Sequence, residues 1–288
     1  MDFTDIEFWK WILGIPAALA ALLTLPFLLY KYYWESKKLR REVELLEDSH
    51  KKLASSIAGS VGYKYHNIEQ IVRLRNDGKI LVHRLVELMV SSGALEALDH
   101  GTWVFADNCI REYSRRVTGT ASGSTISDRT IQMSEKGVRF QIRFDPPLSS
   151  DATYEMEEEL FGAIALTREE VIEQIKLRRW ALDEPYESHT HLCKFETERY
   201  LTRAIFPASY AIGGKEFWDV TTGYTGNRES REYEDLLKSG RVRFADSIQG
   251  QDRILELEIV KPKPGLAYWV KWIPPMKQNC TIHGLERE

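Results

Sequence analysis

The chain has 288 residues, of which 43% are hydrophobic and 28% are charged, as expected for a protein with a packed core. This composition excludes a disordered chain, a collagen and a transporter with many membrane spans. The formal net charge of −4 provides no basic surface of the kind that duplex nucleic acid requires, so no duplex binding is expected. The cysteines, Cys109, Cys193 and Cys280, are too few and too scattered for a disulfide framework, which favours a reducing compartment.

An apolar stretch near the N-terminus predicts a transmembrane anchor within residues 1–34. Trp11 to Tyr30 is twenty residues without a charge, long enough as a helix to cross roughly 30 Å of hydrocarbon. Aromatic residues flank the stretch and two prolines predict a kink or a helix contact. The residues expected to form the anchor are Trp9, Trp11, Pro16, Pro26, Tyr30 and Trp34.

The charges that flank the stretch predict its orientation. Lys31, Lys37, Lys38, Arg40 and Arg41 follow it, whereas the residues before it are mainly acidic. By the positive-inside rule, the N-terminus lies outside and the remaining chain is cytoplasmic, at the inner membrane. The alternative is a cleaved signal peptide, but the acidic start and the lack of a small-residue cleavage site disfavour it.

Residues 35–62 read as a coiled-coil stalk. Apolar residues recur at alternating spacings of four and three, with charges of both signs between them, which predicts homo-oligomerisation. The residues of this seam are Leu39, Val43, Leu46, Leu53 and Ile57. The alternative is an amphipathic helix packed against the chain's own β domain.

Residues 63–99 read as a helical connector. One helix is expected from His66 to Arg75 and a second from Lys79 to Ser92, joined by a turn at Asn76-Asp77-Gly78. Ile80, Leu81, Leu85, Leu88 and Met89 would line one side of the second helix.

From about residue 100 to residue 275 the sequence predicts an antiparallel β-sandwich, followed by a tail at 276–288. In the run 138–144, Val138, Phe140, Ile142 and Phe144 alternate with polar residues, which indicates a half-buried strand. A capping-box pattern opens a short helix over 167–182. The other expected strands cover 103–118, 126–133, 154–166, 187–206, 215–222, 241–247, 253–260 and 266–273.

Three stretches of this region resemble a known type of module. They are the runs at 138–148, 198–207 and 264–272, rich in strand and turn residues. They resemble immunoglobulin-like β-sandwich modules of bacterial conflict and antiphage-defence proteins. The plan of an N-terminal membrane segment before a β-rich domain is also similar to that of membrane-anchored effectors of cyclic-oligonucleotide (CBASS-type) immunity. The resemblance implies a fold and a biological setting, without catalytic residues.

Motifs for phosphate loops, nucleotide folds, serine hydrolases and zinc proteases are absent from the sequence. One constellation would suit zinc: His189, His191 and Cys193 alternate along a predicted strand, and Cys280 and His283 supply a second pair. The alternative is that the histidines are ordinary sheet residues and Cys280 lies in a tail. No other cofactor is expected.

Basic residues suggest a site for an anionic ligand such as a cyclic nucleotide. Arg139 and Arg143 share the polar side of one strand, and a second group combines basic residues with an aromatic ring that can stack on a base. This second group is Lys176, Arg178, Arg179 and Trp180. The alternative is that both groups are solvated surface.

Taken together, these features predict a membrane-anchored, oligomerising and non-enzymatic effector or sensor. Its β-sandwich would bind a nucleotide signal or a protein partner, and the anchor would act on membrane lipid. One alternative is a membrane scaffold that recruits partner proteins. A second is a membrane-tethered, metal-dependent hydrolase that uses His189, His191 and Cys193.

Overall fold

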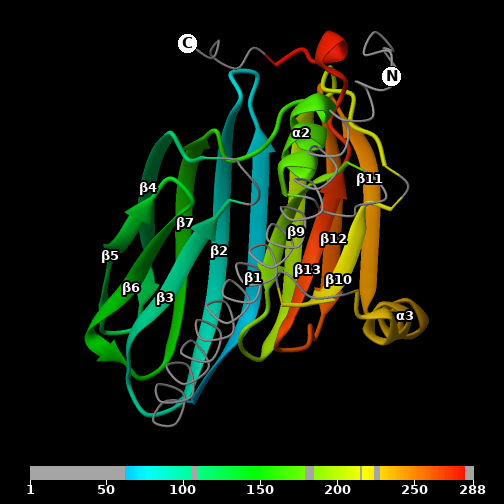
Figure 1. Cartoon of the computed structure of the whole chain (residues 1–288). Coiled ribbons are helices and arrows are strands. Elements are labelled where there is room, and N and C mark those ends of the chain that lie inside the picture. The colour runs from blue at the N-terminus through cyan, green and yellow to red at the C-terminus, as the bar shows by residue number, and fades with distance from the viewer. Residues whose placement is uncertain (1–61, 105–108, 179–184, 215, 224–227, 283–288) are drawn as a thin grey trace, which may run out of the picture. The chain divides into compact units, whose positions relative to one another are not determined.

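The computed structural model describes residues 62–104, 109–178, 185–214, 216–223 and 228–282, which form strands β1 to β13 and helices α2 and α3 (Figure 1). The strands are β1 (Gly62–Leu74), β2 (Lys79–Ser92), β3 (Leu95–Trp103), β4 (Glu112–Ala121), β5 (Thr125–Ser134), β6 (Gly137–Leu148), β7 (Asp151–Phe161), β8 (Glu187–Leu192), β9 (Thr197–Pro207), β10 (Trp218–Thr222), β11 (Val242–Gln249), β12 (Asp252–Val260) and β13 (Leu266–Trp272). The helices are α2 (Arg168–Arg178), α3 (Ser230–Ser239) and the 3-10 turn η1 (Lys277–Asn279).

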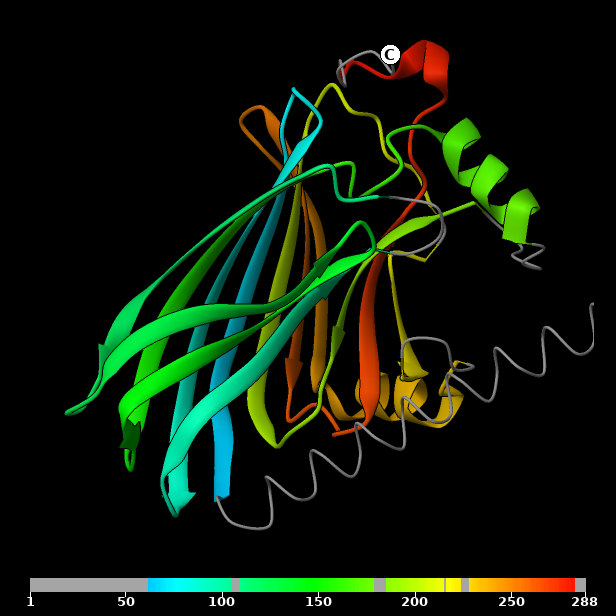
Figure 2. The ribbon, with the colours of Figure 1, turned by 60° about the vertical axis from the view of Figure 1, so that its left-hand side comes forward.

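The strands form three sheets in two layers. One layer is a seven-stranded sheet in the order β11-β12-β9-β1-β2-β7-β4. The other consists of two three-stranded sheets, β3-β6-β5 and β10-β13-β8. Figure 2 shows the first small sheet in front of the β4 end of the large sheet, and β10 and β13 in front of the other end. Strand β9 runs parallel to β1, while the other neighbours are antiparallel.

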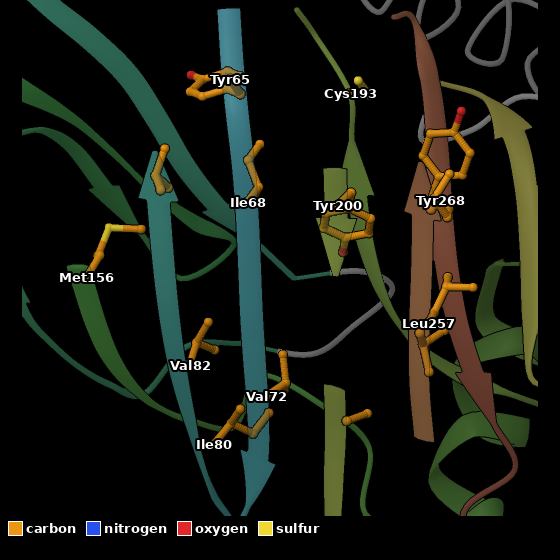
Figure 3. Close-up of a cluster of buried hydrophobic side chains, with 14 of the residues drawn as sticks. Tyr65, Ile68, Val72, Ile80, Val82, Met156, Cys193, Tyr200, Leu257 and Tyr268 are labelled. Carbon is orange, nitrogen blue, oxygen red and sulfur yellow. The ribbon is translucent and has the colours of Figure 1, made fainter. Parts of the chain in front are cut away.

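The core lies between the two layers and is filled by every second residue of the strands. Val72 of β1 and Ile80 and Val82 of β2 are buried and lie close together on the inner face of the large sheet, and Ile68 lies further along β1 (Figure 3). Tyr200 of β9 continues the same face. Since side chains alternate across a strand, the intervening residues face the other side of the sheet.

The alternation predicted for residues 138–144 is confirmed in β6. Val138, Phe140 and Ile142 are completely buried and Phe144 nearly so, whereas Arg143 is exposed. Of the predicted capping box at the start of α2, the bond to the Thr167 hydroxyl is present, while the Glu170 carboxylate accepts from the residue before Thr167. The N–H of Glu170 donates to Oγ1 of Thr167 at 3.3 Å, and the Glu170 carboxylate accepts from the N–H of residue 166 at 2.8 Å.

The helical connector predicted for residues 63–99 is wrong. This segment forms the hairpin of β1 and β2 and then β3, and only the turn at Asn76-Asp77-Gly78 is as expected. Leu81 and Leu85, which fit a helical spacing, lie on the outer face of the sheet, opposite to the buried Val82 and Val86. Both faces of β2 carry apolar residues, so the alternation with period two is masked and a period of 3.6 fits as well.

The predicted immunoglobulin-like sandwich is also wrong. The segment 187–206, predicted as one strand, is two strands that belong to different layers, β8 and β9. The chain turns between the layers at Lys194 and Phe195, where no glycine or proline marks a break. The large sheet moreover spans both small sheets and includes the parallel pair β1 and β9.

The membrane-anchored fold class and the single-pass placement at the inner membrane are contradicted by the structure. The described part of the chain is built mainly from strands, and no helix within it is long and apolar enough to cross a membrane. The predicted span from Trp11 to Tyr30 and the coiled-coil seam from Leu39 to Ile57 lie outside the described residues. An apolar run of twenty residues describes only its own segment, so it does not determine the fold class of the remaining chain.

Gly162, which follows β7, and Gly123, between β4 and β5, both have positive φ, and comparing them tests how tightly the loop after β7 is packed. Gly162 has φ of 80°, and an added Cβ would collide with the backbone oxygen of Cys109. Gly123 has φ of 75° with open space around it. We expect Gly162→Ala to lower the free energy of unfolding by about 2–3 kcal/mol and Gly123→Ala by about 1 kcal/mol, measured by urea unfolding. Equal losses in the two variants would contradict this packing.

Candidate functional site

A row of three polar side chains crosses the centre of the inner face of the large sheet. Gln70 of β1 pairs in register with Arg84 of β2 on one side and with Thr202 of β9 on the other. All three occupy inward positions, as the buried Val82 and Val86 do on either side of Arg84. The row therefore places a guanidinium, an amide and a hydroxyl group next to one another inside the layered core.

Each of these side chains has a buried polar atom without a hydrogen-bond partner. The atoms are Nε of Arg84, Oε1 of Gln70 and Oγ1 of Thr202. The guanidinium of Arg84 also makes no ion pair with any residue in the described part of the chain. Arg84 as a whole is half-buried, and a buried polar atom without a partner, such as its Nε, costs about 1–3 kcal/mol. Arg84 therefore needs an explanation that the fold alone does not supply.

Two histidines of β8 face this row from the opposite layer. His189 and His191 share the inward face of their sheet with the buried residues of β13. The ring of His191 stacks on that of Tyr200, with centroids 4.5 Å apart, whereas Nε2 of His189 has no partner. Burial, and then the charge of Arg84, lowers the pKa of both histidines to about 3. Both rings are therefore neutral at pH 7.

A cavity of about 170 Å³ lies at this place. Its walls come from the inner face of β1 and β2 and from the facing edges of the two small sheets, β3 and β8. Gln70, Arg84 and His189 line it, and each of them has a buried polar atom without a hydrogen-bond partner. The apolar part of the wall includes Val72, Val82, Leu160, Phe206 and Trp272. The arrangement is that of a small-molecule site, an apolar space with a few convergent polar groups.

One carboxylate also lines the cavity, that of Glu187 at the start of β8. Its oxygens accept hydrogen bonds from the backbone N–H of Ala165 at 2.8 Å and of Ser188 at 3.0 Å. These bonds hold the carboxylate against the backbone. Arg84 and Glu187 thus bring a guanidinium and a carboxylate to the same wall.

A second inward carboxylate lies near the β3 edge but serves the scaffold. Glu158 of β7 is fully buried and accepts hydrogen bonds from the hydroxyl of Thr102 at 2.9 Å and from that of Tyr113 at 2.7 Å. Thr102 belongs to β3 and Tyr113 to β4. Glu158 therefore links the small sheet to the end of the large one, and its acceptor capacity is used within the fold.

The residues predicted to bind zinc do not all come together. Sγ of Cys193 lies 3.2 Å from the backbone oxygen of Phe195, while Sγ of Cys280 lies 3.6 Å from that of Leu166. His283 lies outside the described residues. Within the described ranges no group of three histidine, cysteine, aspartate or glutamate side chains could hold a metal ion. Of the predicted set, His189 and His191 face the polar row, and His189 lines the cavity itself.

The basic residues predicted to bind an anionic ligand lie elsewhere. Arg139 pairs with Asp99 at 2.8 Å on the outer face of the β3-β6-β5 sheet, and Arg143 is exposed on the same face. Lys176 and Arg178 belong to α2. Arg179 and Trp180 lie outside the described residues. Arg139 and Arg143 do not line the cavity.

Sequence reasoning missed Arg84 and Gln70 because it placed both in helices. The available signal was the run from Ile80 to Val90, in which Val82 and Val86 flank Arg84 at a spacing of two residues. A single arginine in the apolar register of a β-branched strand is the pattern of an inward charge. The opposing His189 cannot be assigned to the same site from sequence, because it is about a hundred residues away.

If Arg84 is an uncompensated interior charge, its removal should stabilise the protein. We expect Arg84→Met, which keeps a long apolar stem, to raise the free energy of unfolding by about 1–2 kcal/mol. Arg203→Met is the matched control, because Arg203 pairs with Glu69 and with Glu256 on the outer face of the large sheet. Arg203→Met removes these two ion pairs and should lower the free energy of unfolding. Urea unfolding of both variants measures the two signs, and a loss of stability in Arg84→Met would mean that Arg84 holds the fold together.

Comparisons with known proteins identify no family. No protein-family model matches the sequence, and no curated protein matches it. Similar solved structures include a Parabacteroides distasonis protein whose description proposes it as a protease, with 6% identity, a TM-score of 0.40 and coverage of 73% of this chain and 40% of that one. An M1 zinc metallopeptidase from Deinococcus radiodurans has 8% identity, a TM-score of 0.35 and coverage of 73% and 42%. Yeast LTA4 hydrolase has 8% identity, a TM-score of 0.36 and coverage of 72% and 28%.

The matched part spans less than half the length of each of these three proteins. At this level of likeness the matches carry no argument about the activity of this chain. They also do not bear on the resemblance to antiphage-defence modules, which stays a prediction.

Proposed function

We propose that this chain is a small-molecule-binding protein whose ligand occupies the cavity between β1 and β2 and the edges of β3 and β8. The observation that carries the proposal is the guanidinium of Arg84, which lines the cavity without an ion pair or a hydrogen bond within the described chain. A guanidinium without these partners lowers the stability of the free protein, and a bound ligand that pairs with Arg84 would offset this cost.

Three further features support a ligand site over a packing defect. The polar atoms without partners are on different strands and face the same space, as the positions of Gln70, Arg84 and His189 show. The remaining wall is apolar and includes the large rings of Phe206 and Trp272. The cavity of about 170 Å³ is also comparable to engineered cavities of about 150 Å³ that bind benzene.

The proposal retains one element of the function predicted from the sequence, a β domain that binds a signal molecule. It assigns this role to the cavity instead of the basic residues at 139–143 and 176–180. It requires neither a metal nor a catalytic group.

The test is a thermal-unfolding screen of the full chain with molecules of fewer than about ten non-hydrogen atoms, the size that such a cavity holds. A ligand at a hundredfold excess over its Kd should raise the unfolding midpoint by about 5 °C. Val82→Phe, which fills the cavity from β2, should abolish the response. Ala163→Leu fills the cavity from its wall with a side chain smaller than phenylalanine, and it replaces Val82→Phe as the test if that variant fails to fold. A screen without any hit, or hits that persist in both filled variants, would contradict the proposal.

A further inference from the structure

We propose that the ligand is a small molecule with one carboxylate and an apolar body, the carboxylate bound to Arg84 and the body enclosed by Val82, Phe206 and Trp272. This inference rests on the proposed function and adds the chemical class of the ligand. Its basis is that the guanidinium of Arg84, which has no ion pair among the described residues, lines a small cavity whose wall is mainly apolar and carries a few other polar groups.

The anionic group follows from the chemistry of Arg84. A guanidinium stays protonated inside proteins, so its charge has to be matched by an anion or remain uncompensated. Its planar fork of donors fits the two oxygens of a carboxylate, which gives a bidentate and charge-assisted pair. Nε, one of the donors of this fork, is buried and without a partner.

The neighbouring polar groups extend the same recognition. Gln70 lies beside Arg84 in the sheet register; its partnerless atom, Oε1, is an acceptor, and the N–H₂ of the same amide supplies two donors. His189, neutral at pH 7, faces the same space with a ring nitrogen that has no partner. A neutral imidazole can donate one hydrogen bond, so it accommodates an anion without adding charge. Carboxylate oxygens accept several hydrogen bonds each, and these groups can supply them.

A single negative charge fits better than two. Glu187 puts a negative charge on the same wall, and it would repel the second charge of a phosphate monoester or a dicarboxylate. Arg84 is the one cationic side chain among the described residues that line the cavity. One cationic side chain can pair with one negative charge, so the site suits a monoanion.

The apolar body follows from the wall and from the volume. Val72, Val82, Leu160, Phe206 and Trp272 surround the space with carbon, and burial of apolar ligand surface against them is favourable. A volume of about 170 Å³ admits a ring the size of benzene or a short branched chain. A cyclic nucleotide, with its base, sugar and phosphate, is larger than this space.

The experiment compares acids with their neutral amides in isothermal titration calorimetry on the full chain. The probes are benzoate and isobutyrate, with benzamide and isobutyramide as partners of nearly the same shape. We expect at least one acid to bind the wild type at least tenfold more tightly than its amide. Arg84→Met should remove this preference, Arg84→Lys should weaken it, and Arg203→Met on the outer face should leave it unchanged.

The outcomes separate the ligand class from the proposed function. If an amide binds as tightly as its acid, or if neither acid binds while neutral molecules still raise the unfolding midpoint, the cavity is a binding site but its ligand is not a carboxylate. If acids bind equally to the wild type and to Arg84→Met, Arg84 does not recognise them and the inference is overturned. If neither acids, amides nor any molecule of the screen binds, the proposed function itself fails.

Discussion

Replacing Phe140 with alanine is expected to lower the free energy of unfolding by about 3–5 kcal/mol, the cost of removing a large ring from a closed core. Phe140 of β6 is completely buried. Its ring stacks on that of His100 at a centroid distance of 5.6 Å, and the guanidinium of Arg115 lies 3.8 Å from its centroid. The mutation would therefore create a cavity and remove a cation–π contact.

Met133→Ala on the adjacent strand β5 is the matched control. Met133 is 58% exposed, so its loss should change the free energy of unfolding by less than about 0.5 kcal/mol. Urea unfolding followed by tryptophan fluorescence measures both variants. A loss in Phe140→Ala as small as that in Met133→Ala would show that the β3-β6-β5 sheet does not cover the large sheet as described.

Acidification is expected to have the second large effect. Burial, followed by the charge of Arg84, lowers the pKa values of His100, His189 and His191 to about 3. Because the ordinary pKa of histidine is about 6.5, the unfolded chain binds more protons than the folded chain between that pH and pH 3. Stability is therefore complete above about pH 6.5 and falls as the pH decreases through this window.

From pH 7 to pH 5 the free energy of unfolding should decrease by at least about 2 kcal/mol, the amount for one such histidine. Besides Arg84, the charges of Lys194 and Arg115 act on His100, and all of them oppose its protonation. Urea unfolding at the two pH values measures the change, which should become smaller in His189→Gln. Met133→Ala, at an exposed position of β5 and without a titratable group, should leave it unchanged. Equal stability of the wild type at both pH values would contradict neutral, buried histidines.

The strands that sequence analysis predicted correctly are those with one buried and one polar face. In β6 the alternation of Val138, Phe140 and Ile142 with polar residues has only one interpretation, and the structure confirms it. In β2 the outer face is apolar as well, with Leu81 and Leu85, so the same rule does not distinguish strand from helix. The alternation of apolar and polar residues thus identifies a strand only where one face of that strand is exposed to solvent.

The site was less predictable than the fold, because its residues lie far apart along the sequence. His189 was singled out from the sequence, but for a metal, because its neighbours along the chain are His191 and Cys193. In the fold, His189 lines the same cavity as Gln70 and Arg84, because β8 lies in the layer that covers β1 and β2. The pairing of residues about a hundred positions apart depends on the arrangement of the layers, which no short motif encodes.

The most direct test of the account is a crystal structure of the wild-type protein grown with benzoate. The account predicts a carboxylate within hydrogen-bond distance of the Arg84 guanidinium, with the ring of the ligand against Phe206 and Val82. It would be contradicted by a structure in which the guanidinium binds the Glu187 carboxylate directly and closes the space between them.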